Sequence, residues 1–352
     1  MSDALKAAVV GAGRRGRVHT EAMRAAGGYA VAAVCDIAED RAREFAEELD
    51  VGGVYTDMDR MLDAESPEVV VIATYAGSHA ELTEQAAESG VGAICCEKPM
   101  ATSLAEGRRM VDACRENGVH LVISHQRRMG AEMRAMRRLI EEGAIGEPYL
   151  LRGTCPGDLL TDGTHLVNSL RWLAGDEGAR WVLGQVSPAE PEPAEAKGMG
   201  PRKSGGWRYG YPVEDGAIAT WEFESGLRAE ILTGDARFPG RLYQDYEAFG
   251  TEGRLWRKGD NADPPLLIRD GLAGGWREAP VPDGGDPMQE TYAALVRTIR
   301  EGTEHPLAGA SVLRGLEIVM AIHESARTNS KISLPLKQTA YPLRLATGDA
   351  GL

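Results

Sequence analysis

Two side chains of this 352-residue chain, Lys98 and His165, could carry acid–base chemistry. Lys98 lies in Cys95-Cys96-Glu97-Lys98-Pro99, directly after a short apolar run. An open α/β sheet places its ligand crevice outside the carboxyl ends of its strands, which is where this lysine would stand. Pro99 also disfavours helical backbone at Lys98. Taken alone, the motif fits either a catalytic ammonium or a strand-end lysine that reaches solvent.

A glycine-rich turn follows the first apolar run of the chain. Gly11, Gly13 and Gly16 have the G-x-G-x-x-G spacing, and a helical run, Arg17–Ala26, comes next. The first glycine permits a tight turn, the second lets a pyrophosphate approach the backbone, and the third allows close packing of helix on strand. The helix N-terminus adds free N–H donors. Two cations in the turn, Arg14 and Arg15, fit either neutralisation of the pyrophosphate or a solvated surface position.

A carboxylate stands where the ribose of an adenosine would lie. Asp36 ends the second apolar run, 20 residues beyond Gly16. An acid at this position accepts the ribose hydroxyls and repels the 2′-phosphate of NADP. Ile37 follows it, and no Lys or Arg lies between Asp36 and Arg41. The sequence therefore predicts NAD as the cofactor in preference to NADP, with Asp36 and Ile37 beside the ribose.

Charge and hydropathy exclude several classes of partner. The chain has 39 Lys and Arg against 53 Asp and Glu, so its formal charge of −14 disfavours nucleic acid, which binds clustered cations. No window approaches the roughly 20 apolar residues that cross a bilayer. The N-terminus has no signal-peptide pattern. We expect a cytoplasmic protein that binds neither nucleic acid nor membrane.

Cysteine usage indicates packing rather than chemistry. The five cysteines form no Cys-x-x-Cys pair and lie mostly in apolar runs, where a thiol behaves as a small hydrophobe. We find no ligand cluster for a metal either. The sequence therefore predicts buried thiols, without a disulfide framework, and no metal site.

Short apolar runs alternate with amphipathic stretches from Lys6 to about Ser124. This rhythm implies right-handed parallel crossovers and a sheet covered on both faces. It predicts a doubly wound, Rossmann-type α/β domain over residues 1–127. The runs expected to form strands are Ala7–Val10, Val31–Val34, Val69–Ile72, Gly92–Cys95 and Leu121–Ile123.

The pattern changes beyond residue 127. Alternating polarity in Ala217–Glu224 and Leu227–Ile231 is typical of an antiparallel sheet with one covered face. Together with an amphipathic segment, Ala131–Glu142, it predicts an α+β domain over 128–336 for substrate binding and oligomer contacts. Two late helices, near 286–301 and 311–328, are expected to pack back on the first domain. Residues 337–352 are expected to form a loosely held tail.

One segment, 187–206, is rich in Pro, Glu, Ala and Gly and has no periodicity. Such a long segment predicts a loop within the second domain. A lid, an oligomer contact and a surface excursion all fit it. Three aromatic residues near its end could stack on a sugar ring or belong to the core: Trp207, Tyr209 and Tyr211.

The order of these motifs resembles the glucose-fructose oxidoreductase / inositol dehydrogenase family, also written Gfo/Idh/MocA. The resemblance implies an NAD(P)-dependent oxidoreductase that acts on a hydroxyl of a sugar or cyclitol and forms dimers or tetramers. It covers most of the chain. The motifs that carry it are Gly11–Gly16, Asp36, Thr74-x-x-x-x-His79, Glu97-Lys98-Pro99 and Asp162-Gly163-Thr164-His165.

Matched by motif, Lys98 corresponds to the lysine of the family and His165 to its histidine. In this reading His165 is the general base and Lys98 assists at the same oxygen. The family commonly has an Asp four residues before the histidine and often another three after it. Here those places hold Thr161 and Asn168, with Asp162 one residue later. If residues 161 to 173 are helical, either Thr161 or Asp162 could approach His165 and relay its proton.

Further contacts are expected around these residues. The loop after the run ending at Ile72 resembles a family cofactor contact, and His125-Gln126-Arg127-Arg128 closes the last strand beside the same crevice. The family usually has Asn where Gln126 stands. Additional cofactor contacts are Thr74, Tyr75, His79, Glu97 and Lys98. The substrate contacts are Lys98, Gln126, Arg127, Asp162 and His165.

Three functions remain open at this point. The first is reversible oxidation of a secondary alcohol with NAD. The second is a redox-neutral glycosidase or epimerase that recycles a held NAD. The third is a non-catalytic, NAD-binding sugar sensor, which would have no need for both Lys98 and His165.

Overall fold

The computed structural model describes residues 4–187, 207–208, 211–234, 243–271 and 273–346. Tyr209 and nearly all of the segment 187–206 lie outside the described residues. The chain divides into two compact units. The first unit contains Met1–Ala101, Ala105–Met129 and Gly285–Leu313, and the second contains Thr102–Leu104, Gly130–Gly284 and Arg314–Leu352.

The first unit is built on a six-stranded parallel sheet in the order β3-β2-β1-β4-β5-β6. This order confirms the predicted doubly wound sheet. One strand, β3, is too short to show in the hydropathy pattern. The strands are β1 (Leu5–Val10), β2 (Tyr29–Cys35), β3 (Gly53–Tyr55), β4 (Val69–Ile72), β5 (Ala93–Cys96) and β6 (His120–Ile123).

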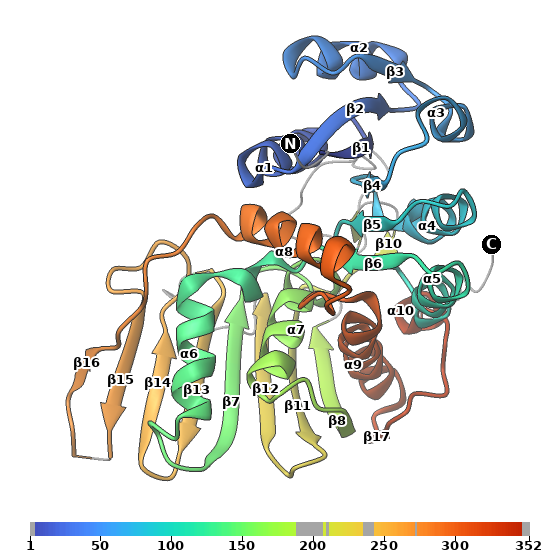
Figure 1. Ribbon diagram of the computed structural model, residues 1–352. Coiled ribbons are helices and arrows are strands. Elements are labelled where there is room, and N and C mark those ends of the chain that lie inside the picture. Colours follow the sequence, from blue (N-terminus) through green and yellow to red (C-terminus); the bar gives the residue numbers. More distant parts are fainter. Residues whose placement is uncertain (1–3, 188–206, 209–210, 235–242, 272, 347–352) are drawn as a thin grey trace. The chain divides into compact units, whose positions relative to one another are not determined.

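Helices cover both faces of this sheet. Figure 1 shows α1 and α8 on one face and α4 and α5 on the other. The apolar side chains of the strands are buried between them, and the five cysteines of the chain are buried too, as predicted. The helices are α1 (Arg14–Ala26), α2 (Glu39–Glu48), α3 (Met58–Glu65), α4 (His79–Glu88), α5 (Leu104–Glu116) and α8 (Pro287–Glu301).

Helix α8 joins the first unit from far along the chain. Met288, Tyr292 and Leu295 are buried in the same hydrophobic cluster as the β1 residue Val9. The helix begins where the Asp286 side chain accepts the backbone N–H groups of the first turn, at 2.8 and 3.1 Å. The sequence placed this helix within the span 128–336 and expected it to pack back on the first domain; in the structure Gly285–Leu313 belongs to the first unit.

The second unit contains a nine-stranded, mostly antiparallel sheet, in which β7 and β12 run parallel. Its order is β16-β15-β14-β13-β7-β12-β11-β8-β17. The strands are β7 (Pro148–Cys155), β8 (Ala179–Ser187), β11 (Gly216–Phe223), β12 (Arg228–Gly234), β13 (Asp245–Gly250), β14 (Gly253–Arg257), β15 (Leu266–Asp270), β16 (Trp276–Glu278) and β17 (Ile332–Ser333); a separate pair is β9 (Trp207–Arg208) and β10 (Tyr211–Pro212).

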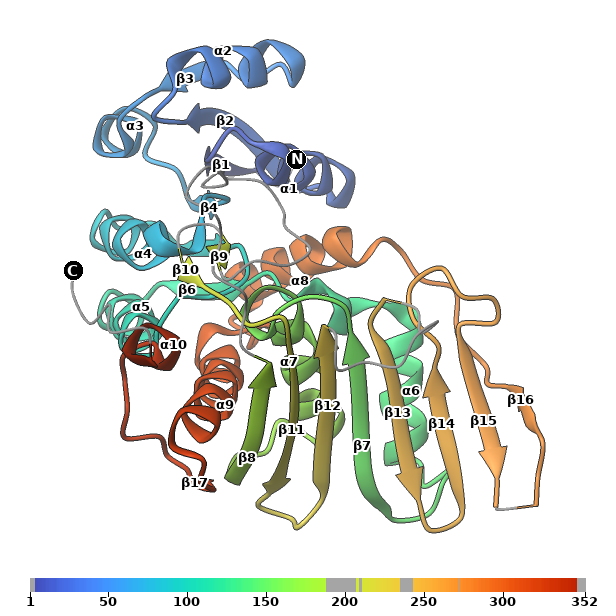
Figure 2. The same ribbon diagram turned by 180° about the vertical axis from the view of Figure 1, so that it is seen from behind.

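One face of the large sheet is covered, as the alternating pattern predicted. Helices α6 (Ala131–Glu141) and α7 (Thr164–Leu173) lie over it in Figure 1. Figure 2 shows the opposite face, over which no described helix lies. In β11, Trp221 and Phe223 are buried while Ile218 is exposed. A further helix, α9 (Gly309–Thr328), follows the edge near β8.

The end of the chain differs from the predicted loose tail. Tyr341 is buried, and its hydroxyl donates to the carbonyl oxygen of Pro212 at 2.8 Å. A short helix, α10 (Pro342–Ala346), follows. Composition did not reveal this anchoring because one aromatic ring in a polar segment carries no periodic signal. Residues 347–352 lie outside the described residues.

Candidate functional site

The glycine turn between β1 and α1 needs glycine at two of its three positions. Gly11 has a positive φ of 105°, and a Cβ there would lie 2.6 Å from the carbonyl oxygen of Ala73. A Cβ at Gly16 would overlap the carbonyl oxygen of Gly11. Gly13 differs, because nothing lies within 4 Å of its Cβ position. The backbone at Gly13 is therefore open to a ligand.

The N-terminus of α1 begins at this open position. Gly13 is the N-cap, and no side chain caps the first turn. The first N–H groups of a helix have no partner within the helix and carry a partial positive charge. The turn thus has the space and the donors that a pyrophosphate requires.

Asp36 fastens the end of β2 to the glycine turn. Its Oδ2 atom accepts the N–H of Ala12 at 2.9 Å, and its Oδ1 atom accepts the N–H of Ala38 at 2.9 Å. Arg41 also donates to Oδ1 at 2.9 Å. A carboxylate offers about four acceptor positions, so one remains for a ribose hydroxyl. Ile37 beside it is 91% exposed and can cover an adenosine.

A buried carboxylate, Glu97, stands directly before Lys98. Its Oε1 atom accepts Arg15 Nε at 2.7 Å and His19 Nε2 at 2.8 Å. Burial alone would raise the pKa of Glu97, but His19 and Arg15 outweigh burial and hold this pKa well below its usual range. Glu97 is therefore an ionised carboxylate. The sequence placed Arg15 at the pyrophosphate or in solvent, and the structure bonds it to Glu97.

The loops after β4 and β5 are joined by His79. Its ring is fully buried, with Nδ1 2.9 Å from the carbonyl oxygen of Pro99 and Nε2 3.2 Å from that of Thr74. Burial lowers the pKa of this imidazole. Among the cofactor contacts expected here, the buried His79 bonds backbone, while Tyr75 is 44% exposed.

The residues that follow β6 bring a histidine close to Lys98. His125 is buried, and its pKa is lowered to about 3 by burial and by the nearby charges of Arg128 and Lys98. It is therefore neutral at ordinary pH. Gln126 and Arg127 are half-buried in a 3₁₀ turn, Gln126–Met129. The sequence named the substrate contacts Gln126 and Arg127 but did not select His125.

In the second unit, His165 lies in the first turn of α7 and is 3% exposed. A π-helical turn, Leu159–Gly163, precedes this helix. Residues 161–173 are therefore not one continuous α-helix, and the spacing argument for a relay needs correction. Thr161 and Asp162 belong to the wider turn, whereas His165 belongs to α7.

Both relay candidates bond side chains from elsewhere in the second unit. The Asp162 carboxylate accepts the Tyr243 hydroxyl at 2.5 Å and Arg208 Nη1 at 3.1 Å. The hydroxyl groups of Thr161 and Tyr211 are 3.1 Å apart. Tyr211 is buried, so it lies in the core as well as against the relay segment.

Three more buried groups support the π-helical turn. The Asp158 Oδ1 atom accepts the Thr161 N–H at 2.7 Å, and Glu214 Oε1 accepts the Leu159 N–H at 2.5 Å. Glu214 Oε2 lies 2.9 Å from His323 Nε2. Burial and the charge of Glu214 raise the pKa of Asp158. The N-cap carboxylate of Asp158 and the distant carboxylate of Glu214 thus hold the turn that leads into His165.

Comparison with known proteins agrees with this architecture. Residues 5–125 match the GFO/IDH/MocA model described as an oxidoreductase family with an NAD-binding Rossmann fold, and residues 133–256 match the GFO/IDH/MocA C-terminal domain. A 1,5-anhydro-D-fructose reductase of Ensifer adhaerens is 30% identical over 85% of this chain and 90% of its own length. The chain belongs to the GFO/IDH/MocA oxidoreductase family.

Other relatives of this GFO/IDH/MocA oxidoreductase carry sugar names. A D-apiose dehydrogenase of Paraburkholderia graminis is 29% identical over 99% of this chain and 94% of its own length. The solved structure of a levoglucosan dehydrogenase in complex with NADH and levoglucosan has a TM-score of 0.78 at 23% identity, covering 94% of this chain and all of that one. The second likeness concerns the fold. The predicted family resemblance is confirmed.

Some features of this GFO/IDH/MocA oxidoreductase left no local signal in the sequence. Arg208 bonds Asp162 and Asp158, and His19 bonds Tyr292 from 273 positions away. Over the described part of the chain, no group of three or more His, Cys, Asp or Glu side chains is arranged to hold a metal ion. No helix among the described residues is long and apolar enough to cross a membrane.

Proposed function

We propose that this oxidoreductase transfers a hydride between a secondary hydroxyl of a sugar, sugar derivative or cyclitol and NAD. The observation that carries the proposal is the set of groups at the carboxyl ends of the strands in the six-stranded sheet. There the open N-terminus of α1, the acceptor Asp36 and the strand-end Lys98 follow the carboxyl ends of strands β1, β2 and β5 of one doubly wound sheet, in which β4 lies between β1 and β5. In doubly wound folds the dinucleotide and its substrate bind at this end of the sheet.

The glycine turn, the first turn of α1 and Asp36 would each bind a different part of the dinucleotide. The N–H groups at Gly13 and the first turn of α1 would hold the pyrophosphate, and Asp36 would accept a ribose hydroxyl beside Ile37. When bound, NAD supplies the nicotinamide that accepts the hydride from the carbinol carbon. The ion pair of Arg41 with Asp36 neutralises part of the carboxylate charge, but the carboxylate still disfavours a 2′-phosphate.

Lys98 and His165 would act on the oxygen of the reacting alcohol. His165 would take the hydroxyl proton as a general base, since an imidazole titrates near neutral pH. The ammonium of Lys98 would donate a hydrogen bond to the same oxygen and stabilise the developing alkoxide. Thr161 or Asp162 would pass the proton on from His165. The names of the relatives, an apiose dehydrogenase and an anhydrofructose reductase, support a sugar as substrate.

A substrate panel tests this function against its two rivals. The purified protein is given NAD and a series of sugars, cyclitols and glycosides, and reduced nicotinamide is followed by absorbance while products are identified. Reduced nicotinamide equal to the substrate consumed is the expected result. Turnover without net reduction would instead assign a recycling glycosidase or epimerase. Binding without turnover of any compound would assign a sugar sensor.

Assembly and location remain predictions. Exposed apolar side chains on strands of the large sheet, such as Tyr149, Leu183 and Ile218, support association of copies into a homo-oligomer. Light scattering coupled to size-exclusion chromatography measures the number of chains. We also propose a cytoplasmic location, which fractionation of the source cells tests.

A further inference from the structure

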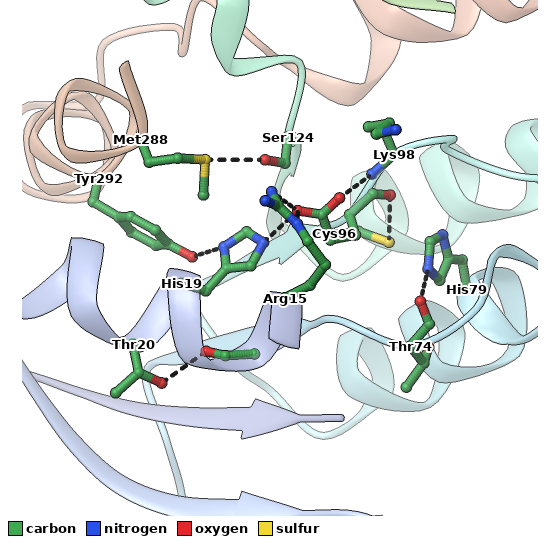
Figure 3. Close-up of polar contacts among 12 residues, drawn as sticks. Arg15, His19, Thr20, Thr74, His79, Cys96, Lys98, Ser124, Met288 and Tyr292 are labelled. Carbon is green, nitrogen blue, oxygen red and sulfur yellow. Dashed lines mark hydrogen bonds and ion pairs between the residues drawn. The ribbon is translucent and has the colours of Figure 1, made fainter. Parts of the chain in front are cut away.

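We propose that His19 and Tyr292 are positioning residues for Lys98, because they fix the Glu97 carboxylate that accepts the backbone N–H of Lys98. The role assigned to Lys98 rests on the proposed function, whereas the placement of its backbone does not. Figure 3 shows the row of contacts from Tyr292 through His19 toward the residue before Lys98. The row lies entirely within the first unit.

Three segments far apart in the sequence meet in this row. Tyr292 comes from α8, His19 from α1 and Glu97 from the end of β5. The Tyr292 hydroxyl lies 2.5 Å from His19 Nδ1, and His19 Nε2 lies 2.8 Å from Glu97 Oε1. The His19 and Tyr292 side chains have no solvent exposure, and Glu97 is 3% exposed. The contacts are therefore shielded from water.

The direction of the hydrogen bonds follows from the chemistry of the groups. An ionised carboxylate only accepts, so His19 Nε2 must carry the hydrogen and donate it to Glu97. In the neutral ring Nδ1 is then an acceptor. Burial raises the pKa of Tyr292 well above its usual value, so this phenol keeps its proton and donates it to Nδ1. One tautomer of His19 satisfies both Glu97 and Tyr292.

This arrangement assigns separate tasks to the two oxygens of Glu97. Oε1 takes the interior donor His19 and the partly exposed donor Arg15. Oε2 faces the backbone N–H of Lys98 at 3.2 Å. Without His19, the buried carboxylate would keep Arg15 but lose its fully buried donor, and it would turn or take up water, since a buried charge that loses a hydrogen-bond partner is unfavourable.

The Lys98–Pro99 segment is held from its other end as well. His79 of α4 bonds the Pro99 carbonyl after the lysine, while His19 of α1 bonds the Glu97 side chain before it. Catalytic groups must be placed closely, and a misplacement of about 1 Å can cost about 10²-fold in rate. A shift of Glu97 would pass directly to the Lys98 backbone and lower kcat.

The test compares two hydroxyl deletions in one buried cluster. Tyr292→Phe removes the donor to His19. Tyr29→Phe is the matched control, because the Tyr29 hydroxyl donates to the Tyr292 carbonyl at 2.8 Å and its ring packs on Tyr292 with centroids 5.5 Å apart. His19→Leu removes the row's donor to Glu97, and His19→Gln offers an amide N–H in its place.

We expect kcat to fall about 10-fold in Tyr292→Phe and about 10²-fold in His19→Leu, with the Kd for NAD unchanged within a few-fold. His19→Gln should recover most of the loss, and Tyr29→Phe should keep kcat whatever its Tm. If the kcat losses merely follow Tm across all four variants, the groups only stabilise the fold and the proposal is overturned. If His19→Leu does not fold, Tyr292→Phe and His19→Gln decide.

A second readout needs no substrate. The chain has seven lysines. Reductive methylation attaches ¹³C-labelled methyl groups to their amines, which NMR then detects. The Lys98 signal is assigned with Lys98→Arg, and we expect it to shift in Tyr292→Phe but not in Tyr29→Phe. An unshifted signal in Tyr292→Phe rejects positioning even if the dehydrogenase activity holds. If the protein oxidises no substrate, the proposed function fails. The NMR measurement still decides whether Tyr292 positions Lys98.

Discussion

The Asp36 carboxylate accepts the N–H of Ala12 and the guanidinium of Arg41, each at 2.9 Å. The acid expected to select the ribose thus also holds the glycine turn and restrains a neighbouring cation. Asp36→Ser removes the charge and releases Arg41 toward the position of a 2′-phosphate. We expect the ratio of kcat/KM for NAD to that for NADP to fall about 10- to 100-fold.

The matched control is the double variant Asp36→Ser with Arg41→Ala. It should lose the gain in NADP use, because the released cation is gone. Both proteins should be less stable by about 1–2 kcal/mol through the lost hydrogen bonds. Unchanged selectivity in Asp36→Ser would mean that the ribose is recognised elsewhere.

Two glycines of the turn should respond differently to the same added methyl group. Gly13→Ala finds open space around its Cβ, so its cost in stability should be at most about 1 kcal/mol, at a helix N-cap. The methyl would nevertheless occupy the approach of the pyrophosphate and raise the Kd for NAD at least 10-fold. Gly11→Ala meets the Ala73 carbonyl at a positive φ and should lose about 1–3 kcal/mol. Thermal unfolding and NAD titration, followed by tryptophan fluorescence, separate the two effects; equal losses of Tm in both variants would contradict the prediction.

Removal of the proposed base should abolish turnover without unfolding the protein. His165→Asn should lower kcat by about 10²–10⁴-fold, the usual contribution of a general base, while the Kd for NAD stays within a few-fold. Lys98→Met should lower kcat comparably. Because both groups are assigned to one oxygen, the double variant should lose much less than the product of the single losses. Near-normal turnover in either single variant rejects its assignment.

The turn before His165 should depend on Glu214. Glu214→Ala leaves the Leu159 N–H and His323 without their buried partner, and each buried polar group left unpaired costs about 1–3 kcal/mol. Glu214→Gln keeps an oxygen for Leu159 and should cost less. Urea unfolding measures both. Equal stability of Glu214→Ala and the parent protein would show that these contacts contribute nothing.

Acid should destabilise the protein through buried neutral histidines. Burial lowers the pKa of His305 to about 4, while its two nitrogens bond the Thr291 carbonyl and the Leu307 N–H. In the unfolded chain His305 binds a proton near pH 6.5. Its contribution to the unfolding free energy is therefore complete above that pH and falls as the pH drops toward 4. His125, with a pKa of about 3, acts in the same direction. Each histidine should cost about 2 kcal/mol at pH 5.

His305→Gln tests this origin. Urea unfolding of the variant between pH 7.5 and pH 5 should show a shallower pH dependence than the parent protein, because one proton fewer is taken up on unfolding. Parallel curves for the two proteins would assign the acid sensitivity to other groups. The depressed pKa of Glu97 acts only at lower pH, where the parent and variant should respond alike.

The sequence predicted those parts of the site that a short stretch encodes. The glycine turn, Asp36 and the strand before Lys98 each lie within one local pattern, and the structure has the turn and both strands where the pattern placed them. The sheet followed from the alternation of apolar runs. Only β3 was missed in the first unit, because three residues form no readable period.

Long-range contacts could not be predicted in this way. Nothing in the sequence around His19 or Tyr292 indicates that they meet, since the hydrogen bond closes a loop of 273 positions. The helix assumed over residues 161–173 was wrong at its start, because Asp158 and Glu214 hold a wider turn there. A buried carboxylate from the distant connection between β10 and β11 can override local helical spacing, and periodicity carries no sign of it.

The entry of α8 into the first unit has a consequence for dissecting this protein. A fragment ending near Met129 would lack Met288, Tyr292 and Leu295, so its sheet would expose an apolar face and His19 would have no phenol beside it. Chimeras between relatives must therefore exchange residues 285–313 together with the N-terminal segment. A single crossover near residue 130 would combine the glycine turn and parallel sheet of one parent with helix α8 of the other parent.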